Sequence, residues 1–283
     1  MRFINPKTDF AFKKIFGSLQ SKDVLISFLN ALLYKGSSTI EDLEIIDPYQ
    51  APQLKGMKDT FLDVKATISG NKTVIIEMQV LNVIGFEKRV LFNAAKAFSI
   101  QLDSGDAYTR LDPVIALTIT DFEMFPDSPQ VISRYTMREQ HRLTPYSNDI
   151  ELVFVELPKF SKSLDELGTI TDRWIYFLQQ ANSLEAMPTD WKEIPPLKKA
   201  LEIAELSNLS REEFEVFQRK EIFLQDSQNA VLKGIEQGIE QGIEQGERSK
   251  AEAIAKALLD VLDLETISEK TGLSVEAITA LKS

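Results

Sequence analysis

The stretch that decides the fold is TFLDVKATISGNKTVIIEMQV, residues 60–80, in which two alternating apolar runs flank a polar turn. The apolar side chains all occupy even positions, namely Leu62, Val64, Ala66 and Ile68 before the turn and Val74, Ile76, Met78 and Val80 after it. Because side chains alternate between the two faces of a strand, this pattern predicts a β-hairpin with one buried face. The other face then carries Asp63, Glu77 and Gln79.

The register of this hairpin follows from the positions of its apolar residues. Opposed residues in an antiparallel pair have numbers of constant sum, and the two apolar sets share a face only if that sum is even. A two-residue Gly-Asn turn gives an odd sum, so we predict a bulge or a three-residue turn at Ser69, Gly70 and Asn71. Glycine or asparagine would take the left-handed conformation there. This register places Asp63 directly across from Glu77.

Two carboxylates directly across from each other repel, which destabilises a purely structural sheet. A divalent cation between them removes that cost. Mg²⁺ suits the place because it prefers hard oxygen ligands, keeps several waters and accepts one or two carboxylates plus phosphate oxygens. Such an ion activates water and stabilises charge on a phosphodiester. The residues alone leave open a second interpretation, a solvated polar face on which Lys65 and Lys72 neutralise the pair.

Composition narrows the chemistry available to the chain. Its 283 residues include no cysteine and one histidine, His141, which excludes disulfides, thiolate chemistry and His-rich zinc sites. Carboxylates remain as the metal ligands. The amino end lacks an apolar signal segment, and no run approaches the roughly 18 apolar residues of a membrane span. We therefore expect a cytoplasmic protein without a membrane partner.

The acidic charge is unevenly distributed. The formal net charge is −11, but residues 1–130 hold 14 Lys+Arg against 16 Asp+Glu, so most of the excess lies further on. The nearly neutral first part permits DNA as a partner, because a bound metal would offset the acids locally. The cations that could then meet phosphates are Lys13, Lys14, Lys55, Lys58, Lys65, Lys88, Arg89 and Lys96.

The segments around the hairpin predict an α/β domain over residues 1–160. A short aromatic-rich helix and the amphipathic helix SKDVLISFLNALL precede the hairpin, and a helix of about twenty residues ending near Gly105 follows it. Apolar strands are expected at 111–122 and 149–160. This order predicts a mixed sheet flanked by helices. Amphipathic helical segments continue from 161 to 232.

The last region, 233–283, holds a repeat and a small helical tail. Residues 234–246 read GIEQGIEQGIEQG, and a period of four turns each isoleucine about 40° from the previous one on a helix. Each glycine costs about 1 kcal/mol against alanine but permits close approach of another helix. Two interpretations remain open, a solvated helical linker or a self-association helix that forms a homodimer. The tail has the pattern of a helix-turn-helix, yet its acidic surface favours a partner surface over a DNA reader.

Several segments in order resemble the PD-(D/E)XK nuclease superfamily and, within it, the Rpn family of recombination-promoting nucleases, also described as transposases. They are NPKTDFAFKKIFG, the LDVKA…IIEMQ hairpin, KRVLFNAAKAFSIQLDSGDAYTRLDPVIAL, FVELPKF, WIYFLQQA and the GIEQG repeat. The resemblance covers essentially the whole chain. It implies a restriction-endonuclease-like core followed by a helical region.

The resemblance assigns roles to the hairpin acids. Asp63 falls on the metal-binding aspartate and Glu77 on the acid of the (D/E)XK element, so both would hold Mg²⁺ or another divalent ion such as Mn²⁺ or Ca²⁺. Gln79 falls where most relatives have lysine, although glutamine is usual in the Rpn group. A neutral amide hydrogen-bonds water or phosphate but supplies no cation. Another cation is therefore expected at the site.

Arg89 is the first choice for that cation, with Lys96 seven residues later on the same helix face and Lys65 beside the first acid as alternatives. Relatives often carry a further acid on the first helix, and Asp9 is the candidate here. The other interpretation of Asp9 is an i,i+4 ion pair with Lys13.

The function implied is a metal-dependent DNA endonuclease that hydrolyses phosphodiester bonds in recombination, mobile-element processing or defence against foreign DNA. The alternative is an interaction protein with a weak nuclease site, acting through its acidic helical C-terminal region.

Overall fold

The structure is a computed structural model that describes residues 2–50 and 60–281. The chain divides into two compact units, Met1–Ile222 and Phe223–Ser283. The first unit contains all the described strands and most of the described helices. Its helical residues after 160 share one apolar core with the sheet. The domain boundaries expected at 160 and 232 remain predictions.

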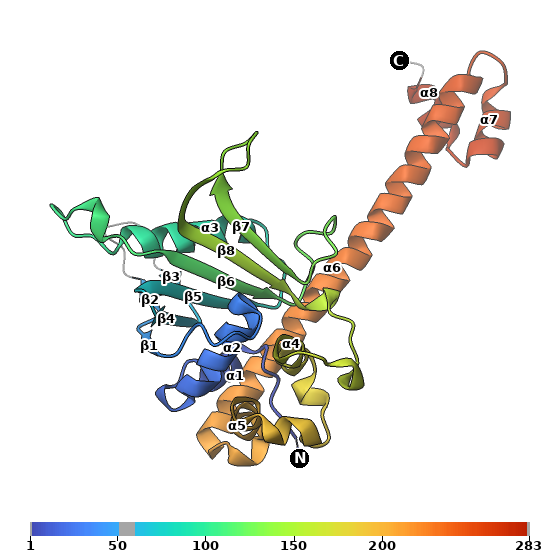
Figure 1. The fold of residues 1–283 in the computed structure, drawn as a ribbon. Helices are drawn as coiled ribbons and strands as arrows, with labels where there is room; N and C mark the ends of the chain where they lie inside the picture. The colour runs from blue at the N-terminus through green and yellow to red at the C-terminus, as the bar shows by residue number, and fades with distance from the viewer. Residues whose placement is uncertain (1, 51–59, 282–283) are drawn as a thin grey trace. The chain divides into compact units, whose positions relative to one another are not determined.

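A six-stranded mixed sheet forms the centre of the first unit (Figure 1). In sheet order its strands are β1 (Leu43–Ile46), β4 (Val64–Ile68), β5 (Lys72–Gln79), β6 (Val114–Thr120), β8 (Pro145–Glu156) and β7 (Ile132–Arg138). β5, β6 and β8 run parallel, and the other neighbours pair antiparallel. A separate two-stranded sheet joins β2 (Tyr49–Gln50) to β3 (Thr60–Phe61). The predicted α/β class with a mixed sheet is confirmed, although β7 was not expected.

Helices cover both faces of this sheet. One face packs against α1 (Asp9–Phe16), α2 (Lys22–Tyr34), α4 (Ile170–Gln180) and α5 (Pro195–Ala204), which together form the large aromatic-rich core. The opposite face packs against α3 (Phe86–Ser99). Figure 1 shows the first group on one side of the strands and α3 on the other. The helix expected to run to Gly105 ends earlier, at Ser99.

The hairpin β4–β5 has the predicted register. Val64 pairs with Ile76 and Ile68 with Lys72, so opposed residue numbers sum to an even value. The three-residue turn holds Gly70 at φ 77° and Asn71 at φ 57°, both left-handed. This confirms the odd-length turn, which the even-numbered apolar side chains require in order to share one face.

Two details of the hairpin differ from the expectation. Leu62 was placed on the same face as Val64, but it packs on the opposite face, beside Ile75 and α3. The reason is local, because the chain bends at Asp63 before β4 begins and alternation does not carry across a bend. The odd-numbered face is also not a solvated polar face, since α3 covers it and buries Ile75.

Helix α6 (Arg211–Leu258) begins in the first unit and continues into the second, which also contains α7 (Leu264–Thr271) and α8 (Val275–Ala280). The GIEQ repeat lies on α6 and is exposed along its length. Ala255, Ile267 and Ile278 form the small core of this unit. Within the described residues, every helix is too short or too polar to cross a bilayer.

Candidate functional site

The two predicted acids lie close together where β4 begins and β5 ends. Asp63 occupies the bend before β4, where its amide donates to the carbonyl of Ile76 at 3.2 Å, and the charge of Glu77 acts on its carboxylate. The β4–β5 register ends at Val64 and Ile76, so the expected pairing of Asp63 with Glu77 stays a prediction. The Oδ2 atom of Asp63 accepts the amide of Met78 at 2.7 Å. The Asp63 carboxylate therefore stays at the edge of β5 instead of turning to solvent.

Side chains from α1 surround the Asp63 carboxylate. The ammonium of Lys13 lies 3.7 Å from its Oδ1 atom. Burial raises the pKa of Asp63 to about 7, against the opposing effect of the Met78 amide and Lys13, and the charges of Asp9 and Glu77 raise it further. The cost of burial thus outweighs the stabilisation that the Met78 amide and Lys13 give to the charged carboxylate.

Asp9 begins α1, directly after the cap Thr8, and fits both interpretations offered for it. Lys13 lies 2.6 Å from its Oδ1 atom as an i,i+4 pair, and Lys220 at the base of α6 lies 3.5 Å from its Oδ2 atom. Burial would raise the pKa of Asp9, but these cations and a hydrogen bond with Asp63 lower it overall. Asp9 therefore forms the i,i+4 ion pair with Lys13 and is also an acid near Asp63, so the two interpretations do not exclude each other.

Lys13 is the cation that the sequence pattern did not connect to Asp63. Burial alone would lower its pKa, but hydrogen bonds and charges from Asp9 and Asp63 outweigh burial and raise it. The spacing to Asp9 was visible in the sequence. The approach to Asp63 depends on how α1 packs on the sheet.

Glu77 is bound from α3. Its Oε1 atom accepts from Arg89 Nη2 at 2.5 Å, and its Oε2 atom accepts weakly from Asn93 Nδ2 at 3.4 Å. Gln79 Oε1 accepts from the same Arg89 nitrogen at 2.6 Å, while its Nε2 donates to the carbonyl of Leu81. Arg89 is thus the cation brought to Glu77 and Gln79. Asn93, one turn later on α3, was not anticipated.

The alternative cations lie elsewhere. Lys96 is buried and donates to the carbonyl of Gln50 at 2.7 Å. Burial lowers the pKa of Lys65, and the charge of Asp47 opposes this. Lys72 pairs with Ile68 beside the turn, at the far end of the hairpin. The proposed neutralisation of the two acids by Lys65 and Lys72 is therefore wrong. Lys55 and Lys58, named as phosphate contacts, lie outside the described residues.

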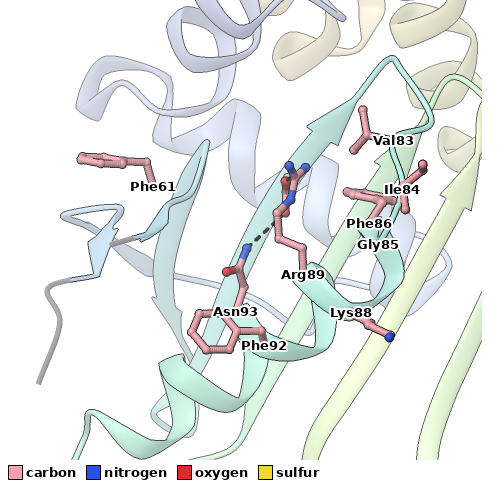
Figure 2. A pocket seen from close by; sticks show the side chains of 10 residues that line it. Phe61, Val83, Ile84, Gly85, Phe86, Lys88, Arg89, Phe92 and Asn93 are labelled. Carbon is pink, nitrogen blue, oxygen red and sulfur yellow. Dashed lines mark hydrogen bonds and ion pairs between the residues drawn. The ribbon is translucent and has the colours of Figure 1, made fainter. Parts of the chain in front are cut away.

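A pocket of about 570 Å³ opens beside Glu77. Figure 2 shows the first turns of α3 and the preceding loop on one side of the pocket, and Phe61 lies across from them. Its lining combines apolar and cationic side chains with the polar groups around Glu77. The residues are Phe61, Glu77, Val83, Ile84, Gly85, Phe86, Lys88, Arg89, Phe92 and Asn93.

One comparison with known families covers the fold and the site described above. A family model described as PD-(D/E)XK nuclease family transposase matches residues 6–234. The chain belongs to this family. Searches of curated proteins and of solved structures found no match. Membership places the chain among nuclease-type hydrolases with a nuclease or transposase-related role, and such nucleases generally use divalent metals.

The donor set is suited to a metal with few protein ligands. In the described part of the chain, no three acidic, histidine or cysteine side chains come together as a metal-binding group. Asp63 and Glu77 offer two carboxylates, and Mg²⁺ accepts one or two together with water and phosphate oxygens. The pKa of Asp63 is raised mainly by burial and further by the charges of Asp9 and Glu77, and a cation would offset both effects on the charged carboxylate. The residues therefore fit a hard divalent cation.

Proposed function

We propose that this protein is a Mg²⁺-dependent DNA endonuclease that hydrolyses phosphodiester bonds, with a role in recombination or in the processing of mobile or foreign DNA. The observation that carries the proposal is the Asp63 carboxylate. It is mostly buried, accepts one backbone amide, and lies near two further acids whose charges raise its pKa. A buried acid with unbalanced charge, at the point where the family has its metal ligand, is typical of a catalytic site.

Asp63 and Glu77 would hold the cation between the bend and the end of β5. When bound, the cation would neutralise charge on the scissile phosphate and favour ionisation of the attacking water. Asp9 adds a third negative charge near this place and so strengthens attraction for a cation. The amide of Met78 fixes the Asp63 carboxylate, which limits the reorganisation needed on binding.

Two cations replace the lysine that Gln79 does not provide. Arg89 contacts both Glu77 and Gln79, and its planar guanidinium suits bidentate contact with a phosphate. Gln79 thereby positions Arg89, while the ring of Phe86, 4.9 Å from the guanidinium carbon, supports it. Lys13 has a raised pKa and remains charged at neutral pH, so it stabilises negative charge and does not accept a proton.

The direct test is the conversion of supercoiled plasmid to nicked or linear DNA by purified full-length protein with Mg²⁺, Mn²⁺ or Ca²⁺. We expect Asp63→Ala and Glu77→Ala to lower the rate by about 100-fold or more, the size typical for loss of a group that stabilises the transition state. Glu44→Ala is the matched control, because Glu44 is an exposed acid on β1 of the same sheet. Cutting that survives in the Asp63→Ala, Glu77→Ala double variant overturns the proposal.

A second candidate function is self-association through α6, as in a homodimer. Ile235, Ile239 and Ile243 of the repeat are 54%, 58% and 58% exposed. A methyl group added at Gly234, Gly238, Gly242 or Gly246 would meet nothing within 4 Å among the described atoms, so another helix has room to approach. Apolar side chains exposed at regular intervals favour a partner over a simple linker.

Light scattering of the full-length protein on a sizing column tests this second function. We expect a dimer mass for the wild type and a monomer mass when all three isoleucines are changed to serine. A monomer mass for the wild type at about 100 µM, well above typical dimer dissociation constants, rejects it. A stable complex through residues 225–283, with no cutting under any metal, would favour the interaction protein over the enzyme.

A further inference from the structure

The pocket beside Glu77 exposes more apolar surface than the site chemistry described above uses. Phe61 is 71% exposed, Phe92 is 39% exposed, and Val83 and Ile84 in the loop before α3 are also exposed. Single exposed apolar residues are ordinary, but several around one concavity mark a binding surface. All four line the same pocket as Glu77. Whatever binds here therefore lies next to the proposed scissile phosphate.

The aromatic wall of the pocket is held in place. Phe61 belongs to the short strand β3, and its ring packs on Tyr49 of β2 with centroids 4.8 Å apart and planes inclined at 32°. Phe61 is only two residues before Asp63 in the chain. Figure 2 shows Phe61 on one side of the pocket and Phe92 on α3 on the other. Asp63, the proposed metal ligand, and the exposed ring of Phe61 thus come from one short segment.

Two polar atoms at the pocket have no hydrogen-bond partner within residues 2–50 and 60–281 of the protein. Among the described residues, Asn93 Oδ1 and Arg89 Nε are buried and have no hydrogen-bond partner. The Asn93 side chain is almost fully buried, with the residue 3% exposed, and its amide orientation is set by the bond from Nδ2 to Glu77. Figure 2 shows the Asn93 oxygen turned to the side of the pocket on which Phe61 lies. Lys88 adds a cation to the lining.

We infer that this pocket binds an unpaired nucleobase next to the scissile phosphate, so that the preferred substrate is DNA with single-stranded character. The inference rests on the proposed nuclease function and specifies its substrate. An aromatic ring stacks on a base only when the face of that base is free, and within an intact duplex neighbouring base pairs cover both faces. Asn93 and Arg89 offer an acceptor and a donor to the edge of the base, and Lys88 offers a charge to the flanking phosphate.

The experiment measures coupling between one aromatic ring and one base. The full-length protein in EDTA, which prevents cutting, is titrated into a fluorescein-labelled single strand of about 12 nucleotides, within the usual site sizes for single strands. Abasic sites are placed at each position in turn, and anisotropy gives the affinity. We expect removal of one base to weaken wild-type binding about tenfold, since stacking is worth about 1–3 kcal/mol per base. In Phe61→Ala the same base removal should have no further effect.

Matched variants distinguish stacking on an aromatic ring from nonspecific apolar binding. Phe61→Leu keeps an apolar side chain without an aromatic face and should lose as much affinity as Phe61→Ala, whereas Phe61→Trp should retain it. Phe223→Ala is the control, because Phe223 is also 71% exposed but lies in the second unit. Phe92→Ala should weaken single-strand binding, with duplex affinity within about twofold of wild type in every variant.

Equal wild-type affinity for single strand and duplex, or full affinity in both Phe61→Ala and Phe92→Ala, overturns the inference. A change in oligomeric mass in these variants with unchanged DNA affinity also overturns it, and would assign the pocket to a protein partner. Plasmid cutting distinguishes this failure from failure of the proposed function. Cutting that needs Asp63 and Glu77 but ignores Phe61 rejects the nucleobase pocket alone, while coupled binding without any cutting rejects the enzyme alone.

Discussion

Two acids at the ends of strands in the same sheet, the buried Glu156 and the half-buried Asp63, differ in how completely their carboxylates are hydrogen-bonded and neutralised. Glu156 ends β8 with no exposed surface, and it accepts the amides of Met124 at 2.6 Å and Phe125 at 3.0 Å and an ion pair from Lys159 at 2.8 Å. Asp63 accepts one amide, and its Oδ1 atom lies 3.7 Å from the cation it shares with another acid.

The difference distinguishes a structural acid from one prepared for a ligand. The partners of Glu156 fold a loop onto the end of β8, and all of them come from within about thirty residues of chain. Burial raises the pKa of Asp63 instead, the nearby charges of Asp9 and Glu77 raise it further, and the charged carboxylate therefore costs the folded protein stability. This free-energy cost has no structural benefit, which favours a role for Asp63 in binding a ligand.

The largest effect is expected from Glu156→Ala. The change removes the carboxylate from Lys159, whose side chain is 6% exposed, and leaves the amides of Met124 and Phe125 without their acceptor. Breaking one side of a buried ion pair costs about 3–5 kcal/mol. Urea unfolding followed by circular dichroism should show this loss. Glu156→Gln, which keeps an acceptor for the amides, should lose less, and a loss below about 1 kcal/mol for alanine would remove the contrast.

The opposite sign is expected for Asp63→Asn in EDTA at pH 8. The amide side chain still accepts the Met78 amide but carries no charge to repel Asp9 and Glu77. A pKa raised from 3.8 to about 7 corresponds to a free-energy cost of the charged form on the order of 4 kcal/mol, at about 1.4 kcal/mol per unit. Thermal unfolding should therefore show a variant more stable than wild type. A destabilised Asp63→Asn would make Asp63 an ordinary structural acid.

The pH window of this effect follows from the same shift. The folded-state pKa of Asp63 is raised above its usual value of 3.8, so folded protein holds the proton more tightly than unfolded chain. Wild-type stability relative to Asp63→Asn is then full below about pH 4, falls as pH rises to about 7, and is flat above that. A wild-type stability that rises relative to Asp63→Asn between about pH 4 and about pH 7 contradicts this sign.

A smaller gain is expected when Mg²⁺ is added to the wild type. A ligand that binds only the folded protein stabilises it by about 2.7 kcal/mol at 100 times its dissociation constant, and by less at lower saturation. The melting temperature at pH 8 should rise with Mg²⁺, and Asp63→Asn should abolish the rise. Glu44→Ala should keep it, because Glu44 lies on the exposed part of β1. An equal rise in Asp63→Asn would place the cation elsewhere.

The smallest effect on stability is expected for Asp9→Asn. Its partners Lys13 and Lys220 are both nearly half exposed, and such ion pairs contribute about 0.2–1 kcal/mol each. The variant should unfold within about 1 kcal/mol of wild type. Because the charge of Asp9 raises the pKa of Asp63, the pH midpoint assigned to Asp63 should nevertheless move down. An unchanged midpoint would separate Asp9 from the site.

Sequence reasoning worked best where the interaction is local. The register of the hairpin and its three-residue turn were predictable because alternation has a period of two and the turn lies between the runs. Arg89 was chosen correctly as the cation that approaches Glu77, while Lys96 on the same face binds Gln50. Helical spacing predicts which side chains share a helix face, but it does not predict which residue each of them contacts.

Contacts across the sheet could not be read in the same way. The approach of Lys13 to Asp63 depends on the docking of α1 near the bend, and the bonds from the Met124 and Phe125 amides to Glu156 depend on a loop that returns to the end of β8. Leu62 was misplaced because the bend at Asp63 interrupts the alternation that the prediction assumed. Phe61 is held at the pocket by pairing with Tyr49, which precedes it by twelve positions in the sequence, so the spacing of residues alone did not predict the contact.

By itself the sequence determined the β4–β5 hairpin, its register and its three-residue turn, with Asp63 and Glu77 as its acids, because side-chain alternation and turn chemistry act over a few residues. Tertiary structure alone decided which cations approach those acids, how dry Asp63 is and which aromatic rings surround the neighbouring pocket. Those properties arise when α1 and α3 pack near the hairpin, and desolvation and charge depend on every group within a few ångströms regardless of its distance along the chain.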